Sequence, residues 1–454
     1  MLRTELILLL VLLLGGCSRE VRPPRHVILL TVDTLRADHL GSYGNALGLT
    51  PNLDRLAQRA ERFTRVYATA PFTLPSIASL LSGRYPKELG IVANIGTLPP
   101  EFPSLAKRLG QKGFTSGAVV SSFVLRSNTG LNAGFAVYDE RLPQREKVRT
   151  SPERIAEPTT DAAIEALDRL LEEGAEHVFL WVHYQDPHGP YTPPEELRAR
   201  YLPHERARPG GEVQLAVTPR GIGGVPTYQY IRGRRDVAFY RAGYNGEVSY
   251  MDREVGRLLD AIAERGMAEE AMIIFTSDHG EGLGEGDYWF AHGDFLNEPL
   301  MRVPLLIHTP GRSPRERDDL ASLVDIAPTL AGLFDPGSND TLPGRDLFAD
   351  AMSGQGRSVH FMTTVHAATK ARAGLVMGQY KYIRTKMPSG AREEVYRLPD
   401  EEDNLAATLP DLTQKLSALL KSWQRAMRAP AATDRPQLSD SEREALRAMG
   451  YIDE

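Results

Sequence analysis

Three short stretches of the chain carry residue types that can hold a metal ion. Asp33 follows the apolar run 26–32, Asp278 and His279 follow the run 272–276, and a histidine-containing segment, 183–188, follows the run 177–182. Because strands of an open parallel sheet end at the same edge, these side chains are expected to meet where such folds bind ligands. Asp and His together suit Zn²⁺ or Mn²⁺, whereas carboxylates without His would fit Ca²⁺ or Mg²⁺ better.

Thr73 offers a hydroxyl at the start of a predicted helix. Pro75 fits the first helical position, where its missing N–H costs nothing, and apolar residues follow at helical spacing up to Gly83. Thr73 would then lie beside unpaired backbone N–H groups and the positive end of the helix dipole, which favour an alkoxide or a phosphoryl group. Threonine is also a common helix cap, so this position alone leaves a capping role open beside a catalytic one.

Strands and helices alternate along the part of the chain that must position these residues. This alternation predicts an α/β fold with a mostly parallel sheet covered on both faces. From residue 358 the pattern changes to short strands and a closing helix, which predicts a small antiparallel sheet plus helix. The expected strands are 26–32, 117–120, 177–182, 272–276 and 303–307, then 359–363, 373–377, 380–384 and 394–398; the expected helices are 50–63, 105–112, 160–173, 240–265, 320–334 and 409–427.

The same pattern predicts the domain organisation. We expect a catalytic domain at 26–350, a C-terminal subdomain at 351–428 and a loosely packed tail at 429–454. Between 197 and 235 the pattern gives way to an excursion rich in Arg, Gly and Pro, interpreted as a solvated loop or an anion-binding lid near the site. An apolar content of 42% and a charged content of 25% are ordinary for a globular protein. No basic stripe interleaved with aromatic residues is present, so a nucleic-acid partner is not expected.

The N-terminus predicts export. Residues 1–16 hold Arg3, an apolar run and a Gly pair, which is typical of a signal peptide and too short for a mature membrane span. Residues 14–17 resemble a bacterial lipobox, which implies lipidation of Cys17 and a tether over 17–25. Ser18 resembles the signal for outer-membrane retention, so we expect a lipid-anchored envelope protein facing the periplasm; a plain signal peptide is the alternative. Cys17 is the only cysteine, which excludes disulfides, thiolate nucleophiles and cysteine zinc sites.

Several motifs resemble sulfatases of the alkaline phosphatase superfamily, in the family's order over about residues 25–425. The resemblance implies an alkaline-phosphatase-like three-layer sandwich and a metal-dependent ester hydrolase. The motifs are Val32-Asp33-Thr34-Leu35-Arg36-Ala37-Asp38, Thr50-Pro51-Asn52-Leu53-Asp54, Pro75-Ser76-Ile77-Ala78-Ser79-Leu80-Leu81-Ser82-Gly83, Asp186-Pro187-His188-Gly189-Pro190-Tyr191, Ser277-Asp278-His279-Gly280-Glu281, Val303-Pro304-Leu305-Leu306 and Leu323-Val324-Asp325-Ile326-Ala327-Pro328-Thr329-Leu330.

The chain departs from this family at the nucleophile. Sulfatases oxidise a Cys or Ser, in a Cys/Ser-x-Pro-x-Arg setting, to formylglycine; this sequence has Thr73 there, with Ile77 at the Arg position and Leu89 where a His is usual. Oxidised threonine would be a ketone, and a threonine adduct cannot be expelled by regenerating an aldehyde. Release must come from attack on the transferred group, which phosphoryl centres beside metal ions accept readily. Thr73 therefore favours phosphate esters.

Superfamily members that use a metal-bound threonine, such as nucleotide pyrophosphatases/phosphodiesterases and phosphoethanolamine transferases, are similar in this respect. That likeness implies that Asp33, Thr73, Asp278 and His279 hold a divalent ion, with Zn²⁺ or Mn²⁺ favoured and Ca²⁺ possible. It also implies that His188 and His292 form a second metal or substrate site. As catalytic residues we expect Thr73, His188, His292 and Arg36, although Arg36 could instead pair with Asp38 or another carboxylate.

Three hypotheses about function follow. The first is a hydrolase that cleaves phosphate mono- or diesters, either small molecules or envelope-derived, through Thr73. The second is a sulfatase without formylglycine. The third is a catalytically inactive, lipid-anchored binding protein.

Overall fold

The computed structural model describes residues 23–145, 152–215, 220–336, 342–349, 356–364 and 371–430, together with residues 439, 440, 443, 444 and 446. The predicted signal segment and Cys17 lie outside these residues. None of the helices in the described part of the chain combines the length and apolarity that crossing a bilayer requires.

A mixed, mostly parallel sheet of eight strands forms the centre of the described chain, in the order β12-β2-β11-β8-β1-β7-β3-β4. Strand β1 lies between β8 and β7 and runs parallel to both, while β11 is antiparallel to its two neighbours. The strands are β1 (His26–Val32), β2 (Glu61–Tyr67), β3 (Thr115–Val120), β4 (Val137–Asp139), β7 (Val178–Tyr184), β8 (Ala271–Ser277), β11 (Arg302–His308) and β12 (Arg315–Ser322).

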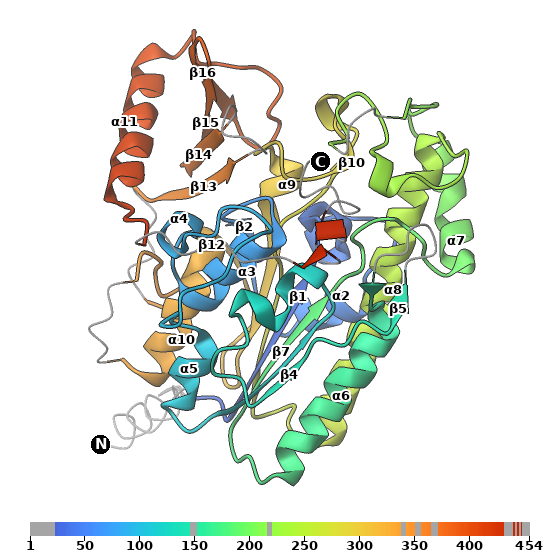
Figure 1. Cartoon of the computed structure of the whole chain (residues 1–454), viewed down its shortest axis with the longest axis vertical. Coiled ribbons are helices and arrows are strands. Elements are labelled where there is room, and N and C mark those ends of the chain that lie inside the picture. The colour runs from blue at the N-terminus through green and yellow to red at the C-terminus, as the bar shows by residue number, and fades with distance from the viewer. Residues whose placement is uncertain are drawn as a thin grey trace, which may run out of the picture.

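Helices cover both faces of this sheet, as Figure 1 shows. Successive side chains of β1 point to opposite faces, so Val27 and Leu29 join one apolar core while Ile28 and Leu30 join the other. The first core includes α3 (Thr73–Ser82), α5 (Leu105–Gly110) and α10 (Ile326–Phe334); the second includes α2 (Pro51–Ala57), α6 (Ala156–Glu172) and α8 (Val237–Glu264). The remaining α-helices are α4 (Pro86–Leu89), α7 (Glu195–Arg206), α9 (Glu298–Met301) and α11 (Pro410–Ala426).

A four-stranded antiparallel sheet follows the central sheet in the chain, and α11 packs against it. Its strands are β13 (Ser358–Thr364), β14 (Ala371–Met377), β15 (Tyr380–Met387) and β16 (Gly390–Arg397); two small hairpin pairs elsewhere are β5 (Gln144–Arg145) with β6 (Pro152–Glu153) and β9 (Gly282–Leu283) with β10 (Trp289–Ala291). The predicted three-layer α/β fold with a small C-terminal antiparallel sheet is therefore confirmed.

Three predicted segments differ from the structure. The helix expected over 50–63 ends at Ala57, and residues 61–67 form β2, because they are captured between β11 and β12. The helix expected to begin at 320 begins at Ile326; residues up to Ser322 belong to β12, and Ser322 and Asp325 form a capping box at the turn between them. The excursion over 197–235 begins within the helix α7 rather than as a loop.

The tail beyond residue 428 is described only in part. Leu446 is buried, with 4% of its surface exposed, and packs in the core on the α3 face of the sheet. At this residue, therefore, the tail belongs to that apolar core.

Candidate active site

Three adjacent strands deliver the candidate metal ligands to one place. Val32 at the end of β1 lies opposite Tyr184 of β7 and Ser277 of β8, so Asp33 continues β1 between the ends of its two neighbours. His183 comes from β7, and Asp278 follows β8. These three side chains, all buried, place ligand atoms within 4.8 Å of one another. The structure thus places Asp33 and Asp278 close together at one sheet edge, with His183 beside them.

The ligand atoms in this cluster fit a divalent cation. Within the described residues, Nε2 of His183, Oδ2 of Asp278 and Nε2 of His279 are buried and have no hydrogen-bond partner. Nδ1 of His279 lies 2.9 Å from the carbonyl oxygen of Gly280, so the proton is on Nδ1 and the lone pair on Nε2. Nε2 of His279 is 3.4 Å from Oδ2 of Asp278 and 3.9 Å from Oδ1 of Asp33. Leaving such groups unpartnered is costly, and a shared cation would satisfy all of them.

Burial controls the protonation of these groups. Desolvation lowers the pKa of His183 to about 4 and that of His279 to about 4, which keeps both imidazoles in the neutral form that binds metals. Desolvation also raises the pKa of Asp278 to about 6 and raises the pKa of Asp33 well above its usual value, and the negative charge of Glu281 raises the pKa of Asp33 further. A divalent cation would lower the pKa values of these two carboxyl groups again, since its charge favours the ionised carboxylates.

Thr73 lies against this cluster. It is fully buried, and its Oγ1 is 3.5 Å from both carboxylate oxygens of Asp33. Helix α3 begins at Thr73, so Pro75 occupies the third helical position. The predicted first position for Pro75 is therefore wrong. Thr73 thus belongs to the helix itself, and the residue before it, Phe72, has the extended backbone of an N-cap without a capping side chain.

Asn94 caps the same helix terminus, contrary to the expectation that the first N–H groups are unpaired. Its Oδ1 accepts a hydrogen bond of 2.9 Å from the backbone N–H of Leu74. Its Nδ2 is buried without a partner among the described residues. Asn94 therefore holds an amide donor at the start of α3, and nothing in the periodicity of its loop indicated this role.

The imidazole rings of His188, His279 and His292 lie together beside the metal-ligand cluster. The ring of His292 is 4.7 Å from that of His279 and 5.2 Å from that of His188, measured between centroids. Nδ1 of His188 lies 2.8 Å from the carbonyl oxygen of Gly189. Nδ1 of His292 lies 3.2 Å from Oε1 of the buried Glu281. The sequence-predicted residues His188, His279 and His292 are therefore brought together, and Glu281 is a member of the site to which sequence reasoning assigned no role.

Arg36 is engaged by carboxylates outside this cluster. Its guanidinium forms ion pairs of 2.7 Å with Asp38 and 2.7 Å with Glu285, and donates to the backbone oxygen of Glu281 at 3.2 Å. The pairing that the sequence left open is thus present. A role for Arg36 at the reacting group stays a prediction, since its recorded contacts do not reach Asp33, Thr73 or Asp278.

The excursion reaches the site through its second half. The ring of Tyr228 stacks on that of His188 with 6.4 Å between centroids, and its hydroxyl donates to the backbone of Phe290, just before the His292 segment. The neighbouring Gln229 is fully buried, and its amide packs against Gly189, where a Cβ atom would lie 1.9 Å from it. The excursion therefore forms part of the wall around His188, in the segment 227–229.

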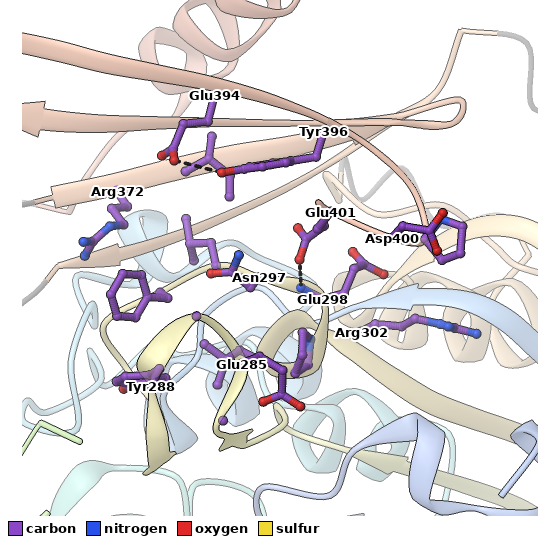
Figure 2. A pocket seen from close by; sticks show the side chains of 18 of the residues that line it. Glu285, Tyr288, Asn297, Glu298, Arg302, Arg372, Glu394, Tyr396, Asp400 and Glu401 are labelled. Carbon is purple, nitrogen blue, oxygen red and sulfur yellow. Dashed lines mark hydrogen bonds between the residues drawn. The ribbon is translucent and has the colours of Figure 1, made fainter. Parts of the chain in front are cut away.

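A large cavity of about 700 Å³ lies away from the metal-ligand cluster. Figure 2 shows it between α9 and the C-terminal sheet, with Asn297, Glu298 and Glu401 near its middle. Of the predicted site residues only Arg36 lines it. Many of its charged groups are paired: Arg36 with Asp38 and Glu285, Arg392 with Glu394, and Glu298 and Glu401 with Lys381, which lies outside the lining. We therefore place the chemistry at the sheet edge and not in this cavity.

The sandwich fold and a buried hydroxyl beside groups that fit a cation are the features expected of ester hydrolases of the alkaline phosphatase type. Comparison with known proteins narrows the class. A family model described as sulfatase matches residues 25–336. The chain therefore belongs to the sulfatase family of the alkaline phosphatase superfamily, as its motifs predicted.

Individual relatives are distant but extensive. The chain is 28% identical over 391 residues to human iduronate 2-sulfatase, with 68% of each chain covered. It is 26% identical over 399 residues to a choline-sulfatase of Rhizobium meliloti, covering 78% of this chain and 77% of the relative. Among solved structures it is similar to a phosphonate monoester hydrolase of Agrobacterium radiobacter, with a TM-score of 0.72, 21% identity and coverage of 89% and 96%. The structural similarity supports the fold.

Proposed function

We propose that this protein hydrolyses phosphate mono- or diesters with Thr73 as the nucleophile. The observation that carries the proposal is the position of Thr73 Oγ1, buried at the start of α3 and 3.5 Å from both oxygens of Asp33. Sulfatases carry their oxidisable Cys or Ser at this motif position. A threonine placed there, beside groups that suit a cation, retains a hydroxyl that can attack an ester directly.

Thr73 acts first. Its Oγ forms a bond to phosphorus as the bond from phosphorus to the leaving oxygen breaks, and the hydroxyl proton leaves toward Asp33. Asp33, His183, Asp278 and His279 would hold a divalent ion, which when bound supplies positive charge that lowers the pKa of the hydroxyl and stabilises the phosphoryl oxygens. The amide of Asn94 and the terminus of α3 add dipoles at the same place.

A second step releases the product. Water attacks phosphorus, the bond from phosphorus to Thr73 Oγ breaks, and this oxygen takes back the proton held by Asp33 as phosphate or a phosphate monoester leaves. We propose that His188 or His292 protonates the leaving oxygen in the first step and takes the water proton in the second, or that the pair contributes to a second metal site. A sulfuryl adduct on threonine could not be expelled as in a formylglycine enzyme, which supports phosphorus over sulfur.

Sulfate esters are the second candidate substrates. The names of the matched relatives favour them, since an iduronate 2-sulfatase and a choline-sulfatase are among those relatives. The similar phosphonate monoester hydrolase favours phosphorus chemistry on the same fold. The two candidates are separated by activity and not by fold.

A substrate panel tests the proposal. The purified mature protein is loaded with Zn²⁺, Mn²⁺ or Ca²⁺, its metal content is measured by elemental analysis, and p-nitrophenyl phosphate, bis-p-nitrophenyl phosphate, p-nitrophenyl phenylphosphonate and p-nitrophenyl sulfate are compared. We expect kcat/KM for a phosphate ester to exceed that for the sulfate, with Zn²⁺ or Mn²⁺ most effective. Faster turnover of the sulfate contradicts the proposal. A metal-free protein inactive on all four substrates supports the binding-protein hypothesis.

We also propose that Cys17 is lipidated and anchors the protein to the outer membrane, facing the periplasm. The proposal is supported by the lipobox-like residues 14–17, with Ser18 after them. The test expresses the full chain and its Cys17→Ser variant in a Gram-negative host with radiolabelled palmitate. We expect label and outer-membrane sedimentation for the unaltered chain only. Unlabelled, soluble protein from both chains would contradict this proposal.

A further inference from the structure

Glu281 is placed to decide which of the two neighbouring histidines, His188 or His292, acts on the leaving group. We propose that Glu281, held by Tyr191, is a positioning residue that orients His292 so that Nε2 of this ring protonates the leaving oxygen. The proposal rests on the proposed function for its reaction, and it assigns a role that the sequence left open between His188 and His292.

The contacts of Glu281 form a short buried chain. Its Oε1 is 3.2 Å from Nδ1 of His292, and its Oε2 accepts a hydrogen bond of 3.1 Å from the hydroxyl of Tyr191. Glu281 and Tyr191 are fully buried, and the side chain of His292 is 4% exposed. These three residues come from separate segments: Glu281 follows β8, His292 follows β10 and Tyr191 follows β7. A carboxylate fixed at both oxygens leaves the imidazole little freedom to turn.

The orientation of His292 follows from these contacts. Because Nδ1 is bound to the carboxylate, Nε2 is the ring atom left for chemistry. The rings of His279 and His188 lie at 4.7 and 5.2 Å, so His292 borders the metal-ligand cluster. His188 differs in this respect, since its Nδ1 meets the backbone oxygen of Gly189, a neutral acceptor. The contact with a buried carboxylate is what favours His292 as the proton donor.

Glu281 is not explained by an ordinary ion pair. Within the described residues no lysine or arginine lies within ion-pair distance of its carboxylate. Arg36 donates to the backbone oxygen of Glu281, while its ion pairs go to Asp38 and Glu285. A carboxyl group buried in this way costs stability, and the fold keeps it against His292.

The proton that the leaving oxygen takes in the proposed step comes from the pair formed by Glu281 and His292. The proposed step requires one proton in the contact between Oε1 of Glu281 and Nδ1 of His292 and a second proton on Nε2. As the bond from phosphorus to the leaving oxygen breaks, that oxygen takes the Nε2 proton, and the shared proton then belongs to Nδ1. In the second step Nε2 takes a proton from the attacking water, which restores the pair.

The test measures how the loss of activity depends on the leaving group. Metal-loaded full-length protein and its Glu281→Gln, His292→Ala and double variants are assayed with aryl phosphate esters from 2,4-dinitrophenyl to phenyl. Protonation of the leaving oxygen matters little for dinitrophenolate, which is a weak base, and greatly for phenolate. The kcat/KM of Glu281→Gln should therefore fall by a few-fold for the 2,4-dinitrophenyl ester and on the order of 10²-fold for the phenyl ester. The double variant should have the same kcat/KM as His292→Ala, because Glu281 acts only through His292 and its loss adds nothing once that ring is absent.

Controls separate positioning from folding. Glu205→Gln alters another buried glutamate, which contacts Arg208 and Asn245, and should keep wild-type kcat/KM for all esters. Tyr191→Phe removes only the bond to Oε2 and should give a weaker loss in the same direction, so it serves if Glu281→Gln fails to fold. Equal losses for all leaving groups, additive losses in the double variant, or loss of bound metal in Glu281→Gln would overturn the proposal.

Failure of the proposed function can be distinguished from failure of the role proposed for Glu281. If only sulfate esters are cleaved, the preference for phosphorus is wrong, and the same leaving-group series run with aryl sulfates still tests Glu281. A leaving-group dependence there supports the role of Glu281, and its absence overturns it.

Discussion

Asp33 and His183 face each other across the parallel pair of strands β1 and β7, with 3.7 Å between Oδ2 of Asp33 and Nε2 of His183. The strand register sets this approach. Thr31 lies opposite His183, and Asp33 follows two residues later on the same face of β1. Thr31 Oγ1 holds the far nitrogen of the ring, Nδ1, at 2.9 Å and itself accepts a hydrogen bond from the indole N–H of Trp181. The near nitrogen, Nε2, is thereby directed at Asp33.

This relationship predicts that His183 binds the metal ion. His183→Ala and Asp278→Asn should each weaken metal binding by at least about tenfold, because each removes one ligand of a buried site. Elemental analysis after dialysis against a limiting chelator measures the effect. His204→Ala removes an exposed histidine of α7 and should bind metal as the wild type does. Unchanged metal content in His183→Ala would show that this side chain is not a ligand.

The contact between the catalytic core and the C-terminal sheet predicts a stability effect. Lys381 is fully buried on β15, with its Nζ 3.1 Å from Glu298 and 2.8 Å from Glu401. Lys381→Met should lower the free energy of unfolding by about 3–5 kcal/mol, because it leaves two buried carboxylates without their cation. Urea unfolding measures this. Lys386→Met, at an exposed position near the end of the same strand, should change the free energy of unfolding by less than about 0.5 kcal/mol. Equal effects of the two substitutions would argue against the buried contact.

His360 predicts a pH dependence. Burial lowers its pKa from 6.5 to about 4. As pH falls below 6.5, the unfolded chain takes up a proton that the folded chain refuses, so stability present above pH 6.5 is lost progressively down to pH 4. His360→Phe should therefore lose about 2 kcal/mol less than wild type between pH 7 and pH 5. The phenyl ring can keep the stack on Trp423, now at 4.7 Å. Urea unfolding at pH 7 and pH 5 measures the free energy of unfolding of both proteins. Equal losses of this free energy in the wild type and in His360→Phe would contradict the prediction.

Much of the site could be predicted because strand ends are visible in sequence. Asp33 and the Asp278–His279 pair directly follow apolar, β-branched runs, and parallel strands bring such positions to one edge. His183 was harder to assign, because it lies within a strand and its neighbour is known only from the sheet order. Glu281 and Asn94 depend on loop paths, which periodicity does not record.

The errors in secondary structure have a tertiary cause. Residues 61–67 form β2 because β11 and β12 offer hydrogen-bonding edges on either side, and this pairing overrides local helical spacing. Residues 320–322 extend β12 because they pair with residues 65–67 of β2, until Ser322 and Asp325 cap the following turn. Composition and spacing hold no information about which edge is available.

The central claim is that the hydroxyl of Thr73 attacks the ester. The most direct measurement is kcat/KM of Thr73→Val on the best phosphate ester, with metal content confirmed to be that of wild type. Valine keeps the shape of threonine and replaces the hydroxyl with a methyl group. The account predicts a fall of at least about 10³-fold, with activity partly retained in Thr73→Ser. Wild-type turnover by Thr73→Val would contradict it.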